Sequence, residues 1–122
     1  MSTSLNVVTV MIGNGSVDQT SVSAKSDGYY GHSDGEHTLS VQFSDFLGRI
    51  QLEGTLVLEP EETDWFPIAL DGDDYIEFTV PQNGTLSYNY RGNIVLSRFK
   101  KIRSYLSSTS SIGDISKVML SI

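Results

Sequence analysis

Apolar side chains in this chain recur at every second residue, within short runs bounded by turn-forming dipeptides. His37–Phe43 is one such run, because Leu39, Val41 and Phe43 fall on one side of an extended backbone and polar residues fall on the other. Successive side chains of a strand point to opposite faces, so this period of two predicts a strand with one buried face.

A second alternating run spans Arg49–Leu58. Glu53 is expected to point outward with the other polar positions of the run, and Gly54 interrupts the inward side. An interrupting glycine indicates a bulge or a close approach of another part of the chain. The inward side chains are expected to be Ile50, Leu52, Leu56 and Leu58.

Further segments complete an all-β pattern. The other predicted strands are Leu5–Met11, Val22–Lys25, Trp65–Leu70, Tyr75–Val80, Leu86–Tyr90, Ile94–Ile102 and Ser116–Ile122. Asn-Gly and Asp-Gly dipeptides, which tolerate positive φ, stand between several of them. We expect Pro81 to end one strand and Asn83-Gly84 to form the hairpin turn into the next. The pattern predicts one all-β domain over residues 1–122, a jelly-roll-like β-sandwich of about eight to nine antiparallel strands.

One segment, residues 94–106, has two interpretations. Val95, Phe99, Ile102 and Leu106 follow the spacing of one helix face. The β-branched start at Ile94 and the absence of a good helix cap favour a strand, and a strand is our prediction.

Composition limits the classes of function. The chain has 122 residues, of which 39% are hydrophobic and none is cysteine. This is enough for one domain, and it excludes disulfides, Cys-based zinc sites and thiolate nucleophiles. The formal net charge of −7 opposes nucleic-acid binding, because phosphate affinity depends on clustered cations.

Two expectations concern membranes and export. No stretch approaches the roughly 18 apolar residues of a spanning helix, so we predict no membrane insertion. The first residues lack the basic and apolar regions of a signal peptide, so synthesis in the cytoplasm is expected.

Two polar groups contain side chains that bind metals in other proteins. Asp71, Asp73 and Asp74 could offer oxygens to Ca²⁺ but lack the EF-hand pattern. The other group suits Zn²⁺ or Mn²⁺ in chemistry, but its spacing matches no strong motif. This group consists of His32, Asp34, Glu36 and His37. We interpret both groups as solvated turns and predict no metal, cofactor or catalytic residue; a small metal-dependent hydrolase using His32, Asp34 and His37 is the weaker alternative.

Charge is distributed unevenly along the chain. Residues 59–77 hold eight acidic groups, and residues 91–103 hold five of the eight basic ones. One interpretation is pairing within the chain or plain solvation; the other is complementary patches on neighbouring copies, which set orientation more than affinity. The second interpretation, together with the doubly apolar N-terminal strand, predicts an interface made of Leu5, Val7, Val8, Val10, Glu61, Glu62, Asp64, Trp65, Arg91, Arg98, Lys100, Lys101 and Arg103.

The aromatic residues have two interpretations as well. Trp65 is expected to be a core or interface anchor. A sugar-binding face is the alternative, because aromatic planes stack on saccharides. Its candidates are Tyr29, Tyr30, Trp65, Tyr75, Tyr88 and Tyr90.

Several segments resemble small β-rich virion structural proteins of tailed bacteriophages, especially contractile-tailed phages of marine cyanobacteria. These segments are Gly28–Gly31, Asp34–Thr38, Gly48–Leu56, Asp64–Ile68, Tyr90–Val95 with Arg98, and Gly113–Leu120. The resemblance implies a non-enzymatic virion component in multiple copies on the capsid surface, the neck or the tail. It also implies a homo-oligomer that contacts other virion proteins and is made in the host cytoplasm. A carbohydrate-binding module for host recognition is the alternative.

Overall fold

The computed structural model describes residues 7–12, 18–25, 36–91, 94–103 and 113–121, and these form an antiparallel all-β fold. A 3₁₀ turn, η2, covers Glu62–Asp64. The eight strands are β1 (Val7–Met11), β2 (Gln19–Thr20), β3 (Ala24–Lys25), β4 (Glu36–Thr55), β5 (Phe66–Ile68), β6 (Ile76–Arg91), β7 (Leu96–Ile102) and β8 (Asp114–Ser121). The prediction of a strand rather than a helix after Asn93 is thereby confirmed over Leu96–Ile102. The described residues contain no helix long and apolar enough to cross a membrane.

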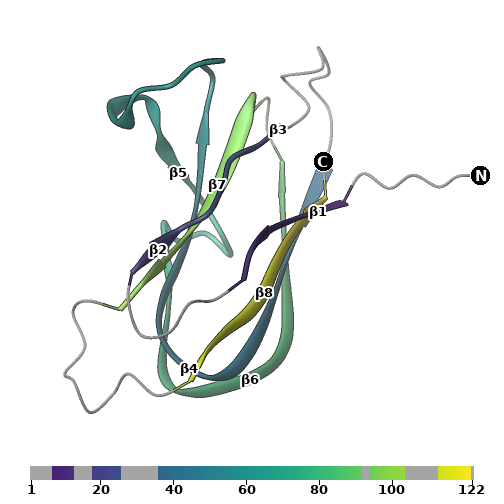
Figure 1. The fold of residues 1–122 in the computed structure, drawn as a ribbon, viewed down its shortest axis with the longest axis vertical. Coiled ribbons are helices and arrows are strands. Elements are labelled where there is room, and N and C mark those ends of the chain that lie inside the picture. Colours follow the sequence, from purple (N-terminus) through teal and green to yellow (C-terminus); the bar gives the residue numbers. More distant parts are fainter. Residues whose placement is uncertain (1–6, 13–17, 26–35, 92–93, 104–112, 122) are drawn as a thin grey trace, which may run out of the picture.

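β4 is the central strand, and four others pair with its two edges (Figure 1). β6 lies along one edge from Glu36 to Ile50, and β5 continues that edge at Leu52–Gly54. β8 and then β7 occupy the opposite edge. β1 adds to β8, while β2 and β3 add to β7. One long strand therefore belongs to both halves of the sheet.

β4 bends sharply between these halves, and β6 bends beside it (Figure 1). The register shifts twice between Phe43 and Gly48, where Asp45 has φ 53° and Gly48 has φ 143°. Asn83 on β6 closes the bend, because its Oδ1 accepts the Asp45 N–H at 3.0 Å and its Nδ2 donates to Asp45 Oδ1 at 2.8 Å. Bulges of this kind increase strand twist and bending.

The bend corrects two predictions. His37–Phe43 and Arg49–Leu58 are parts of a single strand, β4. Asn83-Gly84 is not a hairpin turn and Pro81 does not end a strand, because β6 runs continuously through both. Gly84 does take positive φ, at 87°, but it does so beside the β4 bulge at Ser44 and Asp45 rather than in a chain reversal.

The two halves of the curled sheet enclose one core in a sandwich-like arrangement. Leu39, Val41 and Phe43 are buried together, as the alternation predicted. Phe43 also packs against Phe46 and Phe78 at the bend, with ring centroids 5.5 and 4.9 Å away. Strands from both halves contribute to the same apolar cluster, so neither half is expected to be stable alone.

The second alternating run is buried only in part. Ile50 and Leu52 are buried as predicted, but Leu56 and Leu58 are 63% and 64% exposed. β4 ends at Thr55, so beyond Thr55 alternate side chains no longer lie on one face of a sheet. Gly54 marks a close approach, since a Cβ there would lie 2.9 Å from both Ile68 and Ile94.

Gly113 joins β8 to the bend and provides a test of it. Its φ is +79°, and a Cβ would overlap the carbonyl oxygens of Ser44 and Asp45. We expect Gly113→Ala to lower the free energy of unfolding by about 2–4 kcal/mol, from backbone strain plus displacement of the bend.

Gly72→Ala is the matched control for this effect. Gly72 also has positive φ, +88°, but no atom lies within 4 Å of the added Cβ. Its cost is therefore strain alone, about 1–2 kcal/mol. Denaturant unfolding of both variants measures the difference, and equal losses would show that the contact at the bend is unimportant.

Candidate interaction surface

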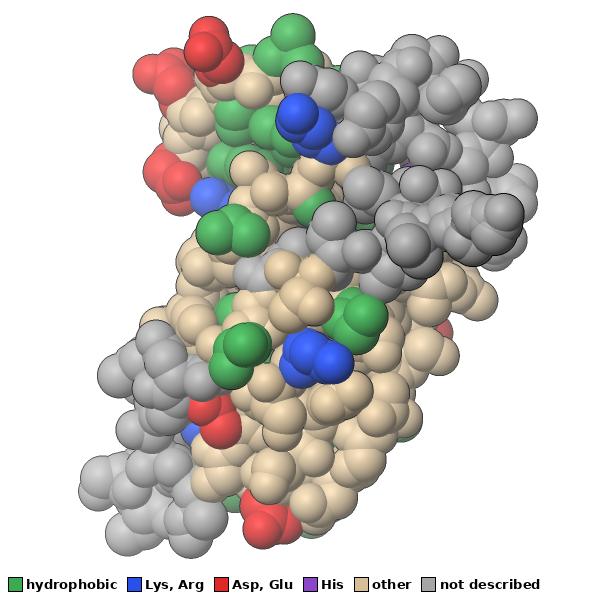
Figure 2. All heavy atoms as spheres, turned by 45° about the vertical axis from the view of Figure 1, so that its right-hand side comes forward, with side chains coloured by type: hydrophobic (Ala, Val, Ile, Leu, Met, Phe, Trp, Pro, Cys, Tyr) green, Lys and Arg blue, Asp and Glu red, His purple; other side chains and the backbone are tan. Residues whose placement is uncertain are grey.

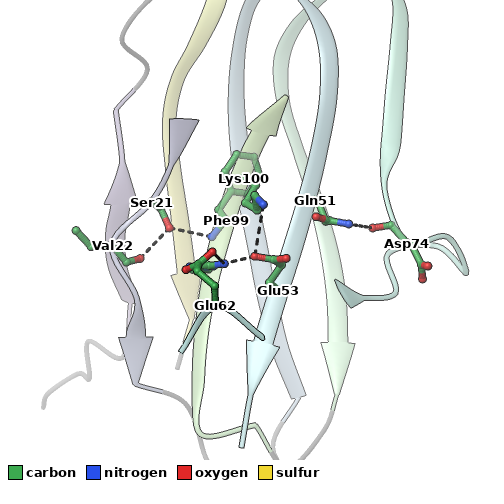
Figure 3. Close-up of polar contacts among 9 residues, drawn as sticks. Ser21, Val22, Gln51, Glu53, Glu62, Asp74, Phe99 and Lys100 are labelled. Carbon is green, nitrogen blue, oxygen red and sulfur yellow. Dashed lines mark hydrogen bonds and ion pairs between the residues drawn. The ribbon is translucent and has the colours of Figure 1, made fainter. Parts of the chain in front are cut away.

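A polar cluster centred on Arg98 holds the loop between β4 and β5 against the sheet. Arg98 Nε donates to Glu53 Oε1 at 2.8 Å, from β7 to the neighbouring position on β4. Its two terminal nitrogens donate to the two oxygens of Glu62 at 3.0 and 3.2 Å. Figure 3 shows Glu53 and Glu62 meeting at this point from the sheet and from the loop. Such bidentate pairs are directional as well as strong.

Glu53 points outward, on the face opposite the buried Leu52, as predicted, but Arg98 and the loop cover it instead of solvent. Its side chain is 12% exposed, and that of Arg98 is 11% exposed. Lys100 Nζ lies 4.0 Å from Glu53 Oε1 and adds a second cation on the same strand. A buried carboxylate needs such partners, because an unpaired charge is costly away from water.

Trp65 completes the cluster from the loop side. The guanidinium carbon of Arg98 lies 4.2 Å from the centre of a Trp65 ring, in the geometry of a cation–π contact. Trp65 is half-buried. Its position accounts for an anchoring role within the chain, and its predicted role in an interface remains a prediction.

The loop itself is ordered by local hydrogen bonds. Asp64 N–H donates to Glu61 O at 2.9 Å, and Glu61 N–H donates to Asp64 Oδ2 at 2.8 Å. This reciprocal pair closes the turn η2 and presents Glu62 toward Arg98. The acidic turn is therefore stabilised by hydrogen bonds between its own residues as well as by Arg98.

Four large apolar side chains on this loop and on β5 are left in solvent. Leu56 and Leu58 are the most exposed, and Val57 and Phe66 are 39% and 38% exposed. We call these four residues the loop patch. Figure 2 shows hydrophobic side chains gathered with acidic ones at the upper end of the molecule, the end at which Figure 1 places this loop. The acidic neighbours in sequence are Glu59, Glu61 and Glu62, all exposed.

The electrostatics of the cluster follow from Arg98. Its hydrogen bond and charge hold the pKa of Glu62 below the ordinary value of 4.5. Burial alone would lower the pKa of Arg98, but hydrogen bonds to Glu62 and Glu53 and their charges outweigh it and raise that pKa. Arg98 therefore stays charged and keeps the loop attached at neutral pH.

The remaining basic residues of β7 and its end are held inside the chain. Lys101 is buried and donates to Asp114 Oδ1 at 2.8 Å. Arg103 is buried, donates to Leu47 O and Gly113 O at 2.8 and 2.7 Å, and lies 5.1 Å from the Phe46 ring centre. Lys101 and Arg103 are therefore paired with groups of their own chain, as the first of the two interpretations of the charge distribution has it.

The predicted interface also includes residues of the N-terminal strand and Arg91. Leu5 lies outside the described residues, and so do the side chains of Val7, Val8, Val10 and Arg91. The backbone of β1 pairs with β8 of its own chain. The interface role of these residues remains a prediction.

The metal-like groups are placed apart. His32 and Asp34 lie outside the described residues, as does the side chain of Glu36. His37 is buried and stacks on Tyr90, with centroids 5.1 Å apart. Within the described ranges no three ligating side chains group closely enough to hold an ion.

The second acidic group lies beside a shallow hollow. Asp71, Asp73 and Asp74 are exposed around the turn after Leu70. The hollow has a volume of about 590 Å³ and is lined by Gly72, Asp73, Asp74, Tyr75 and Glu77. Its lining is acidic, with Tyr75 as the one aromatic side chain.

The tyrosines do not form one platform in the described part of the chain. Tyr88 and Tyr90 are buried, and burial raises the pKa of Tyr88. Tyr75 is 42% exposed, and the Arg49 guanidinium carbon lies 4.6 Å from its ring centre. Tyr29 and Tyr30 lie outside the described residues.

Sequence reasoning missed two features of this surface. The Glu53–Arg98 pair joins residues 45 positions apart, and no local pattern indicates it. The alternation predicts that Leu56 and Leu58 of the loop patch point inward, and this is wrong because both are exposed. Pro60 and the acidic residues after Leu58 were the available signal that the strand had already ended.

No protein-family model matches the chain, and neither a curated protein nor a solved structure shows significant similarity to it.

Acidification tests the hold of Arg98 on the loop. Folding lowers the pKa of Glu62. The Arg98–Glu62 contact therefore stabilises the attached loop at any pH above the ordinary pKa of a glutamate, and this stabilisation is lost as the pH falls through the lowered pKa of Glu62. In an NMR titration, Arg98→Gln is expected to move the Glu62 midpoint back up toward 4.5. Arg49→Gln, which removes a cation beside Glu77, should leave it unchanged; equal effects of both variants would contradict a specific contact.

Proposed function

We propose that this protein is a non-enzymatic structural component of a phage virion, present in multiple copies on the capsid surface, neck or tail. In this proposal the loop patch binds another virion protein. The motif resemblance supports the class of protein, and two of its segments, Gly48–Leu56 and Asp64–Ile68, each contain a residue of the patch, Leu56 and Phe66. The patch supports the mode of action.

The observation that carries the proposal is an apolar surface held in place by buried charge. Single exposed apolar residues are normal, but contiguous ones mark sites that a partner covers. Leu56, Val57 and Leu58 are consecutive, and Phe66 pairs with Gly54 just before them. Arg98 fixes the loop in advance, so a partner need not order it on binding.

The partner is expected to carry positive charge around an apolar centre. Glu59, Glu61 and Glu62 adjoin the patch in sequence. Arg98, Lys101 and Arg103 contact groups of their own chain. Charge complementarity therefore favours a different protein over a second copy at this surface.

Particle incorporation tests the proposal. The protein should be recovered in density-gradient-purified virions at a fixed multiple-copy ratio to the main capsid protein. Leu58→Ser with Phe66→Ser is expected to reduce its copy number at least tenfold, equivalent to about 1.4 kcal/mol or more of binding free energy.

Val80→Ser is the matched control, because Val80 is 68% exposed and lies at the bend of β6, away from the loop. It should incorporate normally, and thermal unfolding should show that all variants fold. Absence of the protein from purified particles would refute the function. Normal incorporation of the double variant would refute the role of the patch.

Glycan binding is the second candidate, favoured by one face of the sheet. Thr38, Ser40 and Gln42 on β4 align with Asn89, Ser87 and Thr85 on β6. These hydroxyl and amide groups suit sugar hydroxyls, and Thr38 Oγ1 already donates to Asn89 Oδ1 at 3.0 Å. Millimolar neutral oligosaccharides should then shift the amide NMR signals of β6; unchanged spectra across a varied panel would remove this candidate.

A further inference from the structure

β6 presents a long strand edge. It contains 16 residues and, among the described parts of the chain, pairs with β4 alone. The strand beside it, β4, has no open edge in this half of the sheet, because β4 pairs with β6 on one side and with β8 on the other. An uncovered edge offers a row of N–H and C=O groups that a further strand can pair with.

Natural edges are protected by charge, proline, bulges or short length. β6 has its extra residues at Thr79–Pro81, which include its proline, and a glycine with positive φ at Gly84, within the bend. Beyond them, Thr85–Asn89 pairs with β4 in unbroken register and contains no charged residue. No residue from Phe78 to Tyr90 is charged. We call Thr85–Tyr90 the straight half of β6, and among the described residues it lacks these forms of protection.

The adjoining face favours a second copy of this chain as the partner. Two copies of a chain with net charge −7 repel at most surfaces. Here the outward residues are Thr, Ser, Asn and Gln, and Lys117 lies two strands away, on β8 opposite Gln42. Figure 2 shows a broad lower area with few charged side chains. A strand edge is also complementary to itself when the two copies run antiparallel.

We propose that two copies pair along β6, antiparallel across a two-fold axis at Ser87. An axis perpendicular to the sheet leaves the outer faces of the two copies on the same side. Odd-numbered residues of one copy therefore oppose odd-numbered residues of the other, and even-numbered ones oppose even-numbered ones. Ser87 then faces Ser87 of the second copy, and Thr85 faces Asn89. On the inner side, half-buried Leu86 faces Tyr88 and extends the apolar core across the junction.

This pairing goes beyond the proposed function and does not depend on it. It uses an edge away from the loop patch, and particle incorporation of the patch variants does not report on it. Its failure in purified protein leaves the virion experiment fully informative.

Sedimentation equilibrium of the purified full chain tests the pairing. The unmodified protein should form dimers at tens of micromolar. Ser87→Lys places two like charges opposite each other and should weaken dimerisation at least tenfold. Ser87→Glu should do the same, while an equal mixture of the two variants should restore dimers as a mixed pair.

Ser44→Lys is the control, since Ser44 is exposed on β4 and paired with Asp114 of β8. It should dimerise like the unmodified protein. A monomeric unmodified protein at several hundred micromolar would overturn the proposal. So would undiminished dimers in Ser87→Lys, or a mixture that stays monomeric.

Hydrogen exchange of the unmodified protein gives a readout that needs no variant to fold. Alternate amides within Thr85–Asn89 should exchange at least tenfold more slowly at high than at low protein concentration. Exchange rates that do not change with concentration would overturn the proposal independently.

Discussion

The shared bend of β4 and β6 is the constraint on which the rest of the structure depends. A single strand crosses from one half of the sheet to the other, so its neighbours must bend at the same level or lose their hydrogen bonds. Asp45 and Gly48 bend β4, Gly84 bends β6, and Asn83 joins the two. Arg103 then ties this bend to the start of β8, because it donates to Leu47 O within the bend and to Gly113 O just before β8. Because both halves meet over Phe43 and Phe46, the core exists only when the bend is formed.

Two arginines near the two ends of β7 have different roles in the fold, and both act through guanidinium hydrogen bonds. Arg103 satisfies backbone carbonyls at the bend, and Arg98 attaches an acidic loop at the opposite end of the strand. A guanidinium has donors for several acceptors at once and stays charged when partly buried. This use of positive charge inside the molecule leaves its surface strongly acidic. The clustering of Arg and Lys in residues 91–103 thus serves the fold first.

Local pattern predicted the strands well and their connections poorly. Leu39, Val41 and Phe43 were identified as core because period two reports which face is buried. Asn83-Gly84 carries the same local signal for a hairpin and for a bulge, and only the opposing bulge of β4 distinguishes them. Leu56 continues the alternation of Ile50 and Leu52 but lies beyond the last pairing of β4. Pairings between distant residues decide such cases, and a single sequence does not contain them.

The loop patch and the edge of β6 differ in the kind of partner that each admits. The loop patch joins apolar side chains to negative charge, so a second acidic copy is disfavoured there and a basic partner is favoured. The straight half of β6 carries no charge, so the repulsion that separates copies elsewhere is weakest at that edge. The two proposed contacts would therefore use different chemistry, backbone hydrogen bonds for a second copy and side chains for a different protein. They would also use separate parts of the fold, the edge of β6 and the loop between β4 and β5 with Phe66.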